Sequence, residues 1–248
     1  NSGIFSAGSL FGALGAALFI KLIPDPKITF LIVGTMFLLY AIIFYFFGLK
    51  KIYEEDEKVE KFKIPERNIL IYGFLLMMNF ATLGVIIDWS PVWLTKDLGA
   101  PLFLGGLAII FFNAGEIVAR VSASKLINRF GEITIGSYFS IISCILLFIT
   151  ILSMNLNIIL FGVLIFGFGT ANFVAIVLRQ AISESNESIS LTVSNLITLG
   201  FGGFIFGPVV VGYLAEYISL TFNMYLLSVI WGFNGLALFY LIKKNQNS

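Results

Sequence analysis

The chain has 248 residues, of which 58% are hydrophobic and only 12% are charged, and its mean hydropathy is +0.99. A soluble domain carries about 25% charged residues, so this composition predicts an integral membrane protein. The net charge of +1 argues against a nucleic-acid surface, and a chain with one Cys and no His excludes disulfide frameworks, His/Cys metal sites and Ser-His-Asp or Cys-His catalysis.

Eight apolar segments are each long enough to span the hydrocarbon core as a helix, which takes about 20 residues. In chain order these segments cover 3–23, 28–49, 67–95, 101–122, 133–154, 157–178, 190–216 and 222–242. Transmembrane strands alternate over about ten residues, so these longer runs of Phe, Leu and Ile exclude a barrel. The sequence therefore predicts an all-α integral membrane protein with eight transmembrane helices.

Polar and turn-forming segments separate the predicted helices. Turns are predicted at "PDPK" (24–27), "DLGAP" (97–101), "NRFGE" (128–132), "MNLN" (154–157) and "SESNES" (183–188), and a solvated loop at the highly charged segment 50–67. Twelve of the 15 Lys and Arg residues fall on the side of the membrane that holds both chain ends. The positive-inside rule therefore predicts that both ends are cytoplasmic.

A shift of 195 residues brings Gly8 onto Gly203 and Gly12 onto Gly207, so the first pair of helices falls on the last pair. Parallel repeats of this kind build one large class of transporters. The alternative is that any two helical hairpins with the same topology align this well. Each Gly-x-x-x-Gly pair places small residues on one helix face and predicts close helix packing.

The second glycine pair is followed by Pro208 and Gly212 in the segment "GFIFGPVVVG". Proline frees a backbone carbonyl and permits a bend in a membrane helix. Static packing and a helix that bends between two states are both compatible with this segment.

Four segments share the order and spacing of one family. Asp-Trp-Ser at 88–90 ends the third predicted helix, "ARVSASKLINRFG" follows the fourth, and "GFGTAN" and "GFIFGPVVVGYLAE" begin at 167 and 203. Together they resemble the major facilitator superfamily, and specifically bacterial permeases whose seventh helix ends in Asp-Trp-Ser. The second segment, which begins just before Arg120, is similar to the family's cytoplasmic loop motif, Gly-x-Leu-x-Asp-Arg-x-Gly followed by basic residues.

Three positions of the loop motif match the family, namely Leu126, Arg129 and Gly131. Three differ, because Ser124 replaces the glycine, Asn128 replaces the aspartate and Glu132 stands where a basic residue is usual. In the family the aspartate holds an inward-closed contact between helices, and an asparagine there can donate a hydrogen bond but forms no ion pair.

The resemblance implies a partial major-facilitator fold that comprises helices five to twelve of the family's twelve. Residues 1–49 would be the last two helices of the N-terminal half, 50–67 the central cytoplasmic loop and 68–248 the complete C-terminal six-helix half. The chain begins with Asn and its first apolar run does not resemble a signal peptide, so we expect four preceding helices, which would be its partners in the same protein. The implied location is the bacterial inner membrane.

A polar group within a membrane span is costly, so each one is a functional hypothesis. The candidates for substrate binding or coupling are Asn79, Asp88, Asn113, Glu116, Asn172 and Asn234. The rise of the helix places Asn79, Asn113 and Asn234 near the bilayer midplane, and Asn172 and Glu116 closer to the cytoplasm. It places Asp88 at the outer mouth, where the neighbouring tryptophans are expected at the level of the lipid headgroups.

Asn113, Glu116 and Arg120 have spacings of three and four residues and share one helix face. Glu116 either pairs with Arg120 in a structural role, with Arg120 reaching the cytoplasmic headgroups, or acts as a proton-binding carboxylate. The asparagines either bridge helices or bind a substrate rich in hydroxyl or amide groups.

The resemblance predicts a secondary transporter of a small polar solute, sugar-like or another metabolite, that works by alternating access and is either coupled to protons or not. The sequence contains no Walker-type loop, so no ATP site is visible. An efflux permease for drugs or metabolites, and a non-transporting receptor or assembly partner with the same fold, remain alternatives. A membrane-embedded enzyme would need a carboxylate pair on facing helices, and Glu116 and Asp88 are too far apart in depth to form it. We therefore expect no enzyme activity, no metal and no cofactor. The expected partners are membrane lipid and a small solute.

Overall fold

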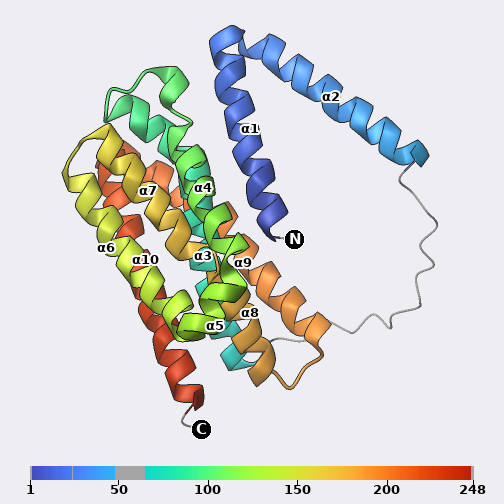
Figure 1. Cartoon of the computed structure of the whole chain (residues 1–248), viewed down its shortest axis with the longest axis vertical. Coiled ribbons are helices and arrows are strands. Elements are labelled where there is room, and N and C mark those ends of the chain that lie inside the picture. The colour runs from blue at the N-terminus through green and yellow to red at the C-terminus, as the bar shows by residue number, and fades with distance from the viewer. Residues whose placement is uncertain (1, 24, 48–64, 247–248) are drawn as a thin grey trace.

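The computed structural model describes residues 2–23, 25–47 and 65–246. Within these ranges the regular secondary structure is helical, and loops and turns connect the helices. Figure 1 shows them in chain order as α1 Ser2–Leu22, α2 Pro26–Phe47, α3 Arg67–Lys96, α4 Leu107–Val121, α5 Ala123–Ile133, α6 Phe139–Leu152, α7 Leu156–Thr170, α8 Phe173–Glu184, α9 Ile189–Tyr217 and α10 Leu220–Gln246. A 3₁₀ turn (η1, Leu102–Leu104) precedes α4, and a π-helical turn (η2, Thr134–Tyr138) precedes α6.

Seven helical stretches of the described residues are long and apolar enough to cross a membrane. They cover Pro26–Phe47, Arg67–Lys96, Leu102–Val121, Ala123–Leu152, Leu156–Glu184, Ile189–Tyr217 and Leu220–Gln246. Each coincides with one predicted span, and α1 coincides with the remaining one. The prediction of an all-α, multi-pass membrane protein is confirmed.

The turn predicted at 128–132 is present as a kink at Gly131, whose φ of 80° suits glycine and which divides α5 into two helical parts. The predicted span 157–178 falls within the helical stretch Leu156–Glu184, and this stretch is interrupted once, because α7 ends at Thr170 and α8 begins at Phe173. Most of the charged loop predicted at 50–67 lies outside the described residues.

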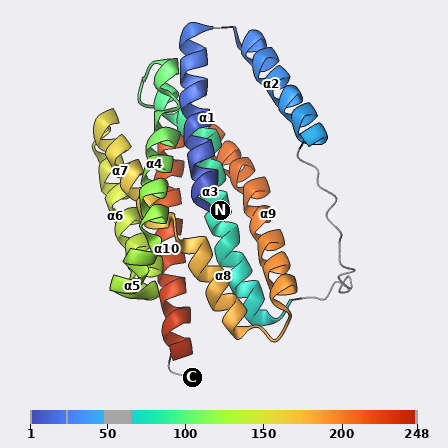
Figure 2. The same cartoon turned by 45° about the vertical axis from the view of Figure 1, so that its right-hand side comes forward.

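The helices α3 to α10 form one body to which α1 is attached. Within this body α3 packs along α9, α4 packs along α7, and α6 contacts both α7 and α10. Helix α1 lies against α4, whereas α2 stands apart in both views (Figures 1 and 2) and has no buried residue. The apolar surface of α2 therefore faces outward, as expected for a helix that meets lipid or another helix.

Glycines mark the closest contacts within the body. A Cβ atom at Gly203 would meet the Met77 carbonyl oxygen of α3, and one at Gly207 would meet Ala81. Small residues allow this close approach of two membrane helices. The contact between α4 and α7 is built in the same way, because Gly115 and Gly167 each lie against the backbone of the facing helix.

The first predicted glycine pair behaves differently. A Cβ atom at Gly8 or Gly12 would meet nothing within 4 Å, and both residues are exposed. Contrary to expectation, these two glycines form no close helix contact among the described residues. Gly12 instead lines an open groove between α1 and α2.

The C-terminal end of α3 is bonded to α9 and α10. Helix α3 continues through Pro91 to Lys96, in agreement with the predicted span 67–95. The Trp89 Nε1 donates to the Pro208 carbonyl at 3.0 Å, and the Trp93 Nε1 donates to Thr221 Oγ1, also at 3.0 Å. Trp93 is buried, with 1% exposure, so it packs between helices and does not face lipid.

Helix α9 runs through Pro208 without interruption and ends at Tyr217. The Pro208 ring packs close to Gly84 of α3, and the Trp89 ring lies over Gly212 one turn further along α9. Pro208 and Gly212 thus take part in the packing of α3 against α9.

Candidate functional site

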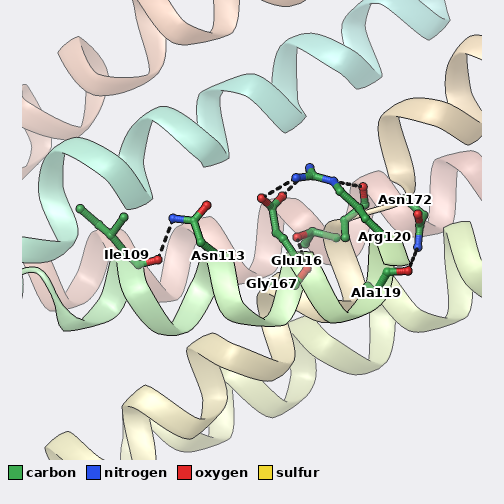
Figure 3. Close-up of polar contacts among 9 residues, drawn as sticks. Ile109, Asn113, Glu116, Ala119, Arg120, Gly167 and Asn172 are labelled. Atoms are coloured by element: carbon green, nitrogen blue, oxygen red, sulfur yellow. Dashed lines mark hydrogen bonds and ion pairs between the residues drawn. The ribbon is translucent and has the colours of Figure 1, made fainter. Parts of the chain in front are cut away.

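Three polar side chains line one side of α4. Figure 3 shows Asn113, Glu116 and Arg120 projecting from the same side of the helix, one turn apart. Asn113 and Glu116 are each 3% exposed, and the Asn113 Nδ2 donates to the Ile109 carbonyl at 2.8 Å. The spacing of three and four residues predicted this shared face.

Glu116 and Arg120 form a bidentate ion pair. The Arg120 Nη1 donates to Glu116 Oε2 at 2.8 Å, and the Arg120 Nη2 donates to Glu116 Oε1 at 2.7 Å. The side chain of Arg120 is only 12% exposed, and that of Glu116 only 4%. Two parallel charge-assisted hydrogen bonds make this the strongest geometry available to an Arg and a carboxylate.

The ion pair lies at the break between α7 and α8. Arg120 Nε donates to the Ala171 carbonyl at 3.3 Å, and Asn172 Nδ2 donates to the Ala119 carbonyl of α4 at the same distance. A break in a membrane helix frees backbone carbonyls, which then need other donors. Arg120 satisfies one of them, so a single side chain joins the ion pair to the break.

Asn79 and Asn234 belong to a different interface, between α3 and α10. The Asn234 Nδ2 donates to the Leu75 carbonyl at 3.2 Å, one turn before Asn79. The Oδ1 atoms of Asn79 and Asn234 and the Nε1 of Trp231 are buried without a hydrogen-bond partner among the described residues. Buried polar atoms without partners are costly, so these three atoms are positions for a bound water or a polar ligand.

The other predicted site residues lie apart from the ion pair. Asp88 is exposed, two turns before the end of α3. On α5, Leu126 is partly buried against the core, whereas Asn128 and Arg129 are exposed. The Arg129 guanidinium lies 5.3 Å from the centre of the Phe130 ring.

Sequence reasoning missed two polar groups on α8. Arg179 forms an ion pair with Glu132, whose second carboxylate oxygen accepts from Gln180 Nε2 at 2.9 Å. The ion pair could have been suspected from the sequence, because an acidic residue, Glu132, stands where the family motif has a basic one, and an acidic side chain there favours a basic partner.

The second group joins α3, α8 and α10. The Tyr72 hydroxyl and the Asn245 Nδ2 both donate to Glu184, and Asn245 also donates to the Tyr72 oxygen at 3.2 Å. These residues are far apart in the sequence and follow no local spacing. Among the described residues there is no group of three or more His, Cys, Asp or Glu side chains that would suit a metal ion.

Comparison with known proteins agrees with this architecture. A family model described as Major Facilitator Superfamily matches residues 1–202. The chain is 25% identical over 219 residues to an uncharacterized MFS-type transporter of Yersinia pestis, a match that covers 88% of this chain and 57% of the relative.

Two further relatives match a smaller share of this chain and of their own length. The chain is 24% identical to an uncharacterized transporter of Sinorhizobium fredii, over 62% of this chain and 41% of the relative. It is 26% identical to the membrane protein MosC of Rhizobium meliloti, over 61% of this chain and 37% of the relative. The chain thus spans about half the length of the curated relatives that it matches.

Proposed function

The chain belongs to the major facilitator superfamily, and on that premise we propose that it is part of a secondary transporter of a small polar solute. The transporter works by alternating access, in which two helical halves rock around a site near the middle of the membrane. Coupling is to protons, with Glu116 as the group that binds them. The observation that carries this proposal is the buried ion pair of Glu116 and Arg120 at the break between α7 and α8.

The physical cost of this pair supports a functional role. Well-packed apolar residues in place of a buried ion pair are often neutral or even stabilising, so a purely structural contact has no need of one. Polar residues inside membrane spans face cavities and mark substrate or proton pathways. Asn113 and Asn172, directly beside the pair, add amide groups that suit hydroxyl-bearing or amide-bearing solutes.

The proposed arrangement assigns residues 68–248 to one six-helix half and 1–49 to two helices of the other half, joined by a cytoplasmic loop at 50–67. Two features support this division. Helix α2 stands apart and has no buried residue, and α1 is attached only to the surface of the body formed by α3 to α10, along α4. The proposed location is the bacterial inner membrane with both ends of the chain in the cytoplasm, supported by the distribution of Lys and Arg.

Uptake into proteoliposomes tests the proposal. The full-length protein is reconstituted and assayed with sugars, amino acids, organic acids and cationic drugs, with and without an imposed pH gradient. We expect uptake of at least one small polar solute, accelerated by the gradient. The matched control is the variant Glu132→Gln, which removes the half-buried carboxylate of the pair with Arg179 and leaves the Glu116–Arg120 pair intact.

Two outcomes would argue for another function. Tight binding of one ligand without uptake of any solute would indicate a receptor or assembly partner with the same fold. Gradient-driven export restricted to apolar cationic drugs would indicate an efflux permease, and the polar-solute proposal would then be wrong.

A further inference from the structure

We propose that a cavity between α5, α8 and α10 binds the headgroup of an anionic phospholipid whose phosphate carries a polyol, as in phosphatidylglycerol. This proposal goes beyond transport, because it concerns the lipid around the protein and its test needs no transported solute. It rests on the place of the cavity at one end of three membrane helices, on its mixed polar and apolar lining, and on the basic side chains at its edge.

The cavity has a volume of about 460 Å³ and lies where the kinked end of α5 meets α8 and α10. Its lining includes Gln180 near the end of α8 and Gln246 at the end of α10. Both views show α5, α8 and the C-terminal end of α10 together at one end of the body (Figures 1 and 2).

The length of the helices places this end near a membrane surface. The helical stretches that line the cavity are Ala123–Leu152, Leu156–Glu184 and Leu220–Gln246, with 27 to 30 residues each. A helix of this length measures about 40–45 Å, which exceeds the roughly 30 Å of the hydrocarbon core. The cavity near their ends is therefore expected at the level of the lipid headgroups.

The lining of the cavity has an apolar and a polar part. The apolar part consists of Phe130, Ile133 and Ile242, and the polar part includes Thr134, Gln180 and Gln246. The side chains of Thr134 and Gln246 form no hydrogen bond with another residue of the described ranges, so a hydroxyl group and an amide remain for the hydroxyl groups of a ligand. A phospholipid meets both parts, because acyl chains adjoin its polar headgroup.

The carboxylate in the lining already has two donors. Glu132 Oε1 accepts from Arg179 Nη1, and Glu132 Oε2 accepts from Gln180 Nε2 at 2.9 Å. Arg179 and Glu132 thus balance each other's charge. A cationic headgroup such as ethanolamine would have to displace Arg179 from this carboxylate, so the geometry disfavours a cation.

Two further basic side chains give the edge of the cavity a positive charge. The Arg129 guanidinium lies 5.3 Å from the centre of the Phe130 ring, which is part of the lining. Lys243 directly follows a lining residue of α10. Within the described ranges neither Arg129 nor Lys243 forms an ion pair. Their charges complement a phosphodiester, and basic pockets between membrane helices bind anionic lipid headgroups.

These groups divide the headgroup among them. Arg129 and Lys243 face the phosphate, and Thr134 and Gln246 accept and donate hydrogen bonds to the polyol. The acyl chains leave the cavity along its apolar part. A choline or ethanolamine headgroup has the phosphate but lacks the hydroxyl groups and the net negative charge.

Native mass spectrometry of the full-length protein in detergent tests the proposal. The protein is titrated with phosphatidylglycerol, phosphatidylethanolamine and phosphatidylcholine that carry the same two acyl chains. We expect phosphatidylglycerol to bind about tenfold or more tightly than the other two, because it alone uses both the basic edge and the polar lining. Glycerophosphoglycerol, the same headgroup without chains, should not displace the lipid at an equal concentration.

The outcomes with the unaltered protein are decisive in either direction. Equal affinity for the three lipids, or tighter binding of phosphatidylethanolamine, would overturn the proposal. Displacement by an equal concentration of glycerophosphoglycerol would indicate a site for a soluble polyol phosphate, and the assignment to lipid would be wrong. Solute uptake is not measured in this experiment, so its failure leaves the proposed transport function untouched.

Two variants test the assigned contacts. Arg129→Gln should weaken binding of phosphatidylglycerol by about tenfold, and Thr134→Val by about threefold, with the affinity for phosphatidylcholine unchanged in both. The matched control is Lys96→Gln, which removes a positive charge at the opposite, exposed end of α3. Equal affinities of Arg129→Gln and Lys96→Gln for phosphatidylglycerol would contradict the proposal.

A third variant tests the sign of the ligand's charge. Glu132→Gln removes the carboxylate that balances Arg179, so the affinity for phosphatidylglycerol should rise severalfold. At a site that holds a cationic headgroup through Glu132, the same change would weaken binding. A lower affinity for phosphatidylglycerol in Glu132→Gln would therefore overturn the proposal.

Discussion

Two Arg–Glu ion pairs with the same chemistry lie in different surroundings. The side chains of Glu116 and Arg120 are 4% and 12% exposed, whereas those of Glu132 and Arg179 are 21% and 68% exposed. Water screens the second pair, so its contribution to stability is about 0–1 kcal/mol. In the first pair each charge depends on its partner, because no solvent replaces it. Burial in the protein, rather than the pairing itself, distinguishes the first pair from the second.

Removing one member of each pair should give the largest contrast. We expect Glu116→Ala to lower the free energy of unfolding by about 3–5 kcal/mol, because the Arg120 charge stays buried without compensation. The measurement is the thermal unfolding midpoint of the protein in detergent. The double variant Glu116→Leu with Arg120→Met removes both charges and should recover most of the loss. A double variant as unstable as the single one would show that the cost comes from lost volume and not from charge.

Close packing between α3 and α9 offers a test without any charge. Gly203→Ala should destabilise the protein by about 1–3 kcal/mol, because the new methyl group meets the Met77 backbone. The neighbouring Gly202→Ala is the matched control, since its nearest contact would be the Met77 Sδ at 3.7 Å. Unfolding midpoints of the two variants that coincide would mean that the interior accommodates volume more readily than the glycine contacts indicate.

The Tyr72 cluster lies between the two extremes of burial. Tyr72→Phe removes a hydroxyl that donates to Glu184 and accepts from Asn245, with the ring retained. A loss of about 1 kcal/mol in unfolding free energy is expected for this change. Tyr240→Phe, at a side chain that is 68% exposed, should have almost no effect on the same measurement. A loss of several kcal/mol for Tyr72→Phe would place the cluster with the buried pair rather than between the two.

The exposed pair should respond least. Glu132→Gln is expected to change the unfolding free energy by about 0–1 kcal/mol, and the difference from the unaltered protein should shrink at high salt. Thermal unfolding at low and high ionic strength measures both effects. If Glu132→Gln lowered the free energy of unfolding as much as Glu116→Ala at both ionic strengths, the two ion pairs would not differ in the way that their burial indicates.

Much of the fold could be predicted because it depends on local properties of the chain. The eight spans follow from length and apolar content, and turns such as the one at 154–157 follow from their polar residues. The pairing of Glu116 with Arg120 was also within reach, because a spacing of four residues on a helix brings two side chains together whatever surrounds them. The alternatives for this pair concerned its role and not its existence.

The missed features depend on residues far apart in the sequence. The break at Ala171 is stabilised by a donor from α4, some fifty residues earlier, and the Trp93 contact depends on Thr221 at the start of α10. In each case the acceptor, the Ala171 carbonyl or the Thr221 hydroxyl, has no feature in its own segment that indicates the contact. Neither contact could be predicted from its two segments taken separately.

The sequence by itself determined the class of fold, the number and order of the membrane helices and the polar side of α4. These are consequences of bilayer thickness and of helix periodicity, which act on each segment separately. Only the tertiary structure decided which equivalent segments come into contact. Gly8 and Gly12 repeat the spacing of Gly203 and Gly207, yet within the described part of the chain the second pair alone lies against another helix. A glycine pair makes close packing possible, and a neighbouring helix on the same face is what makes it occur.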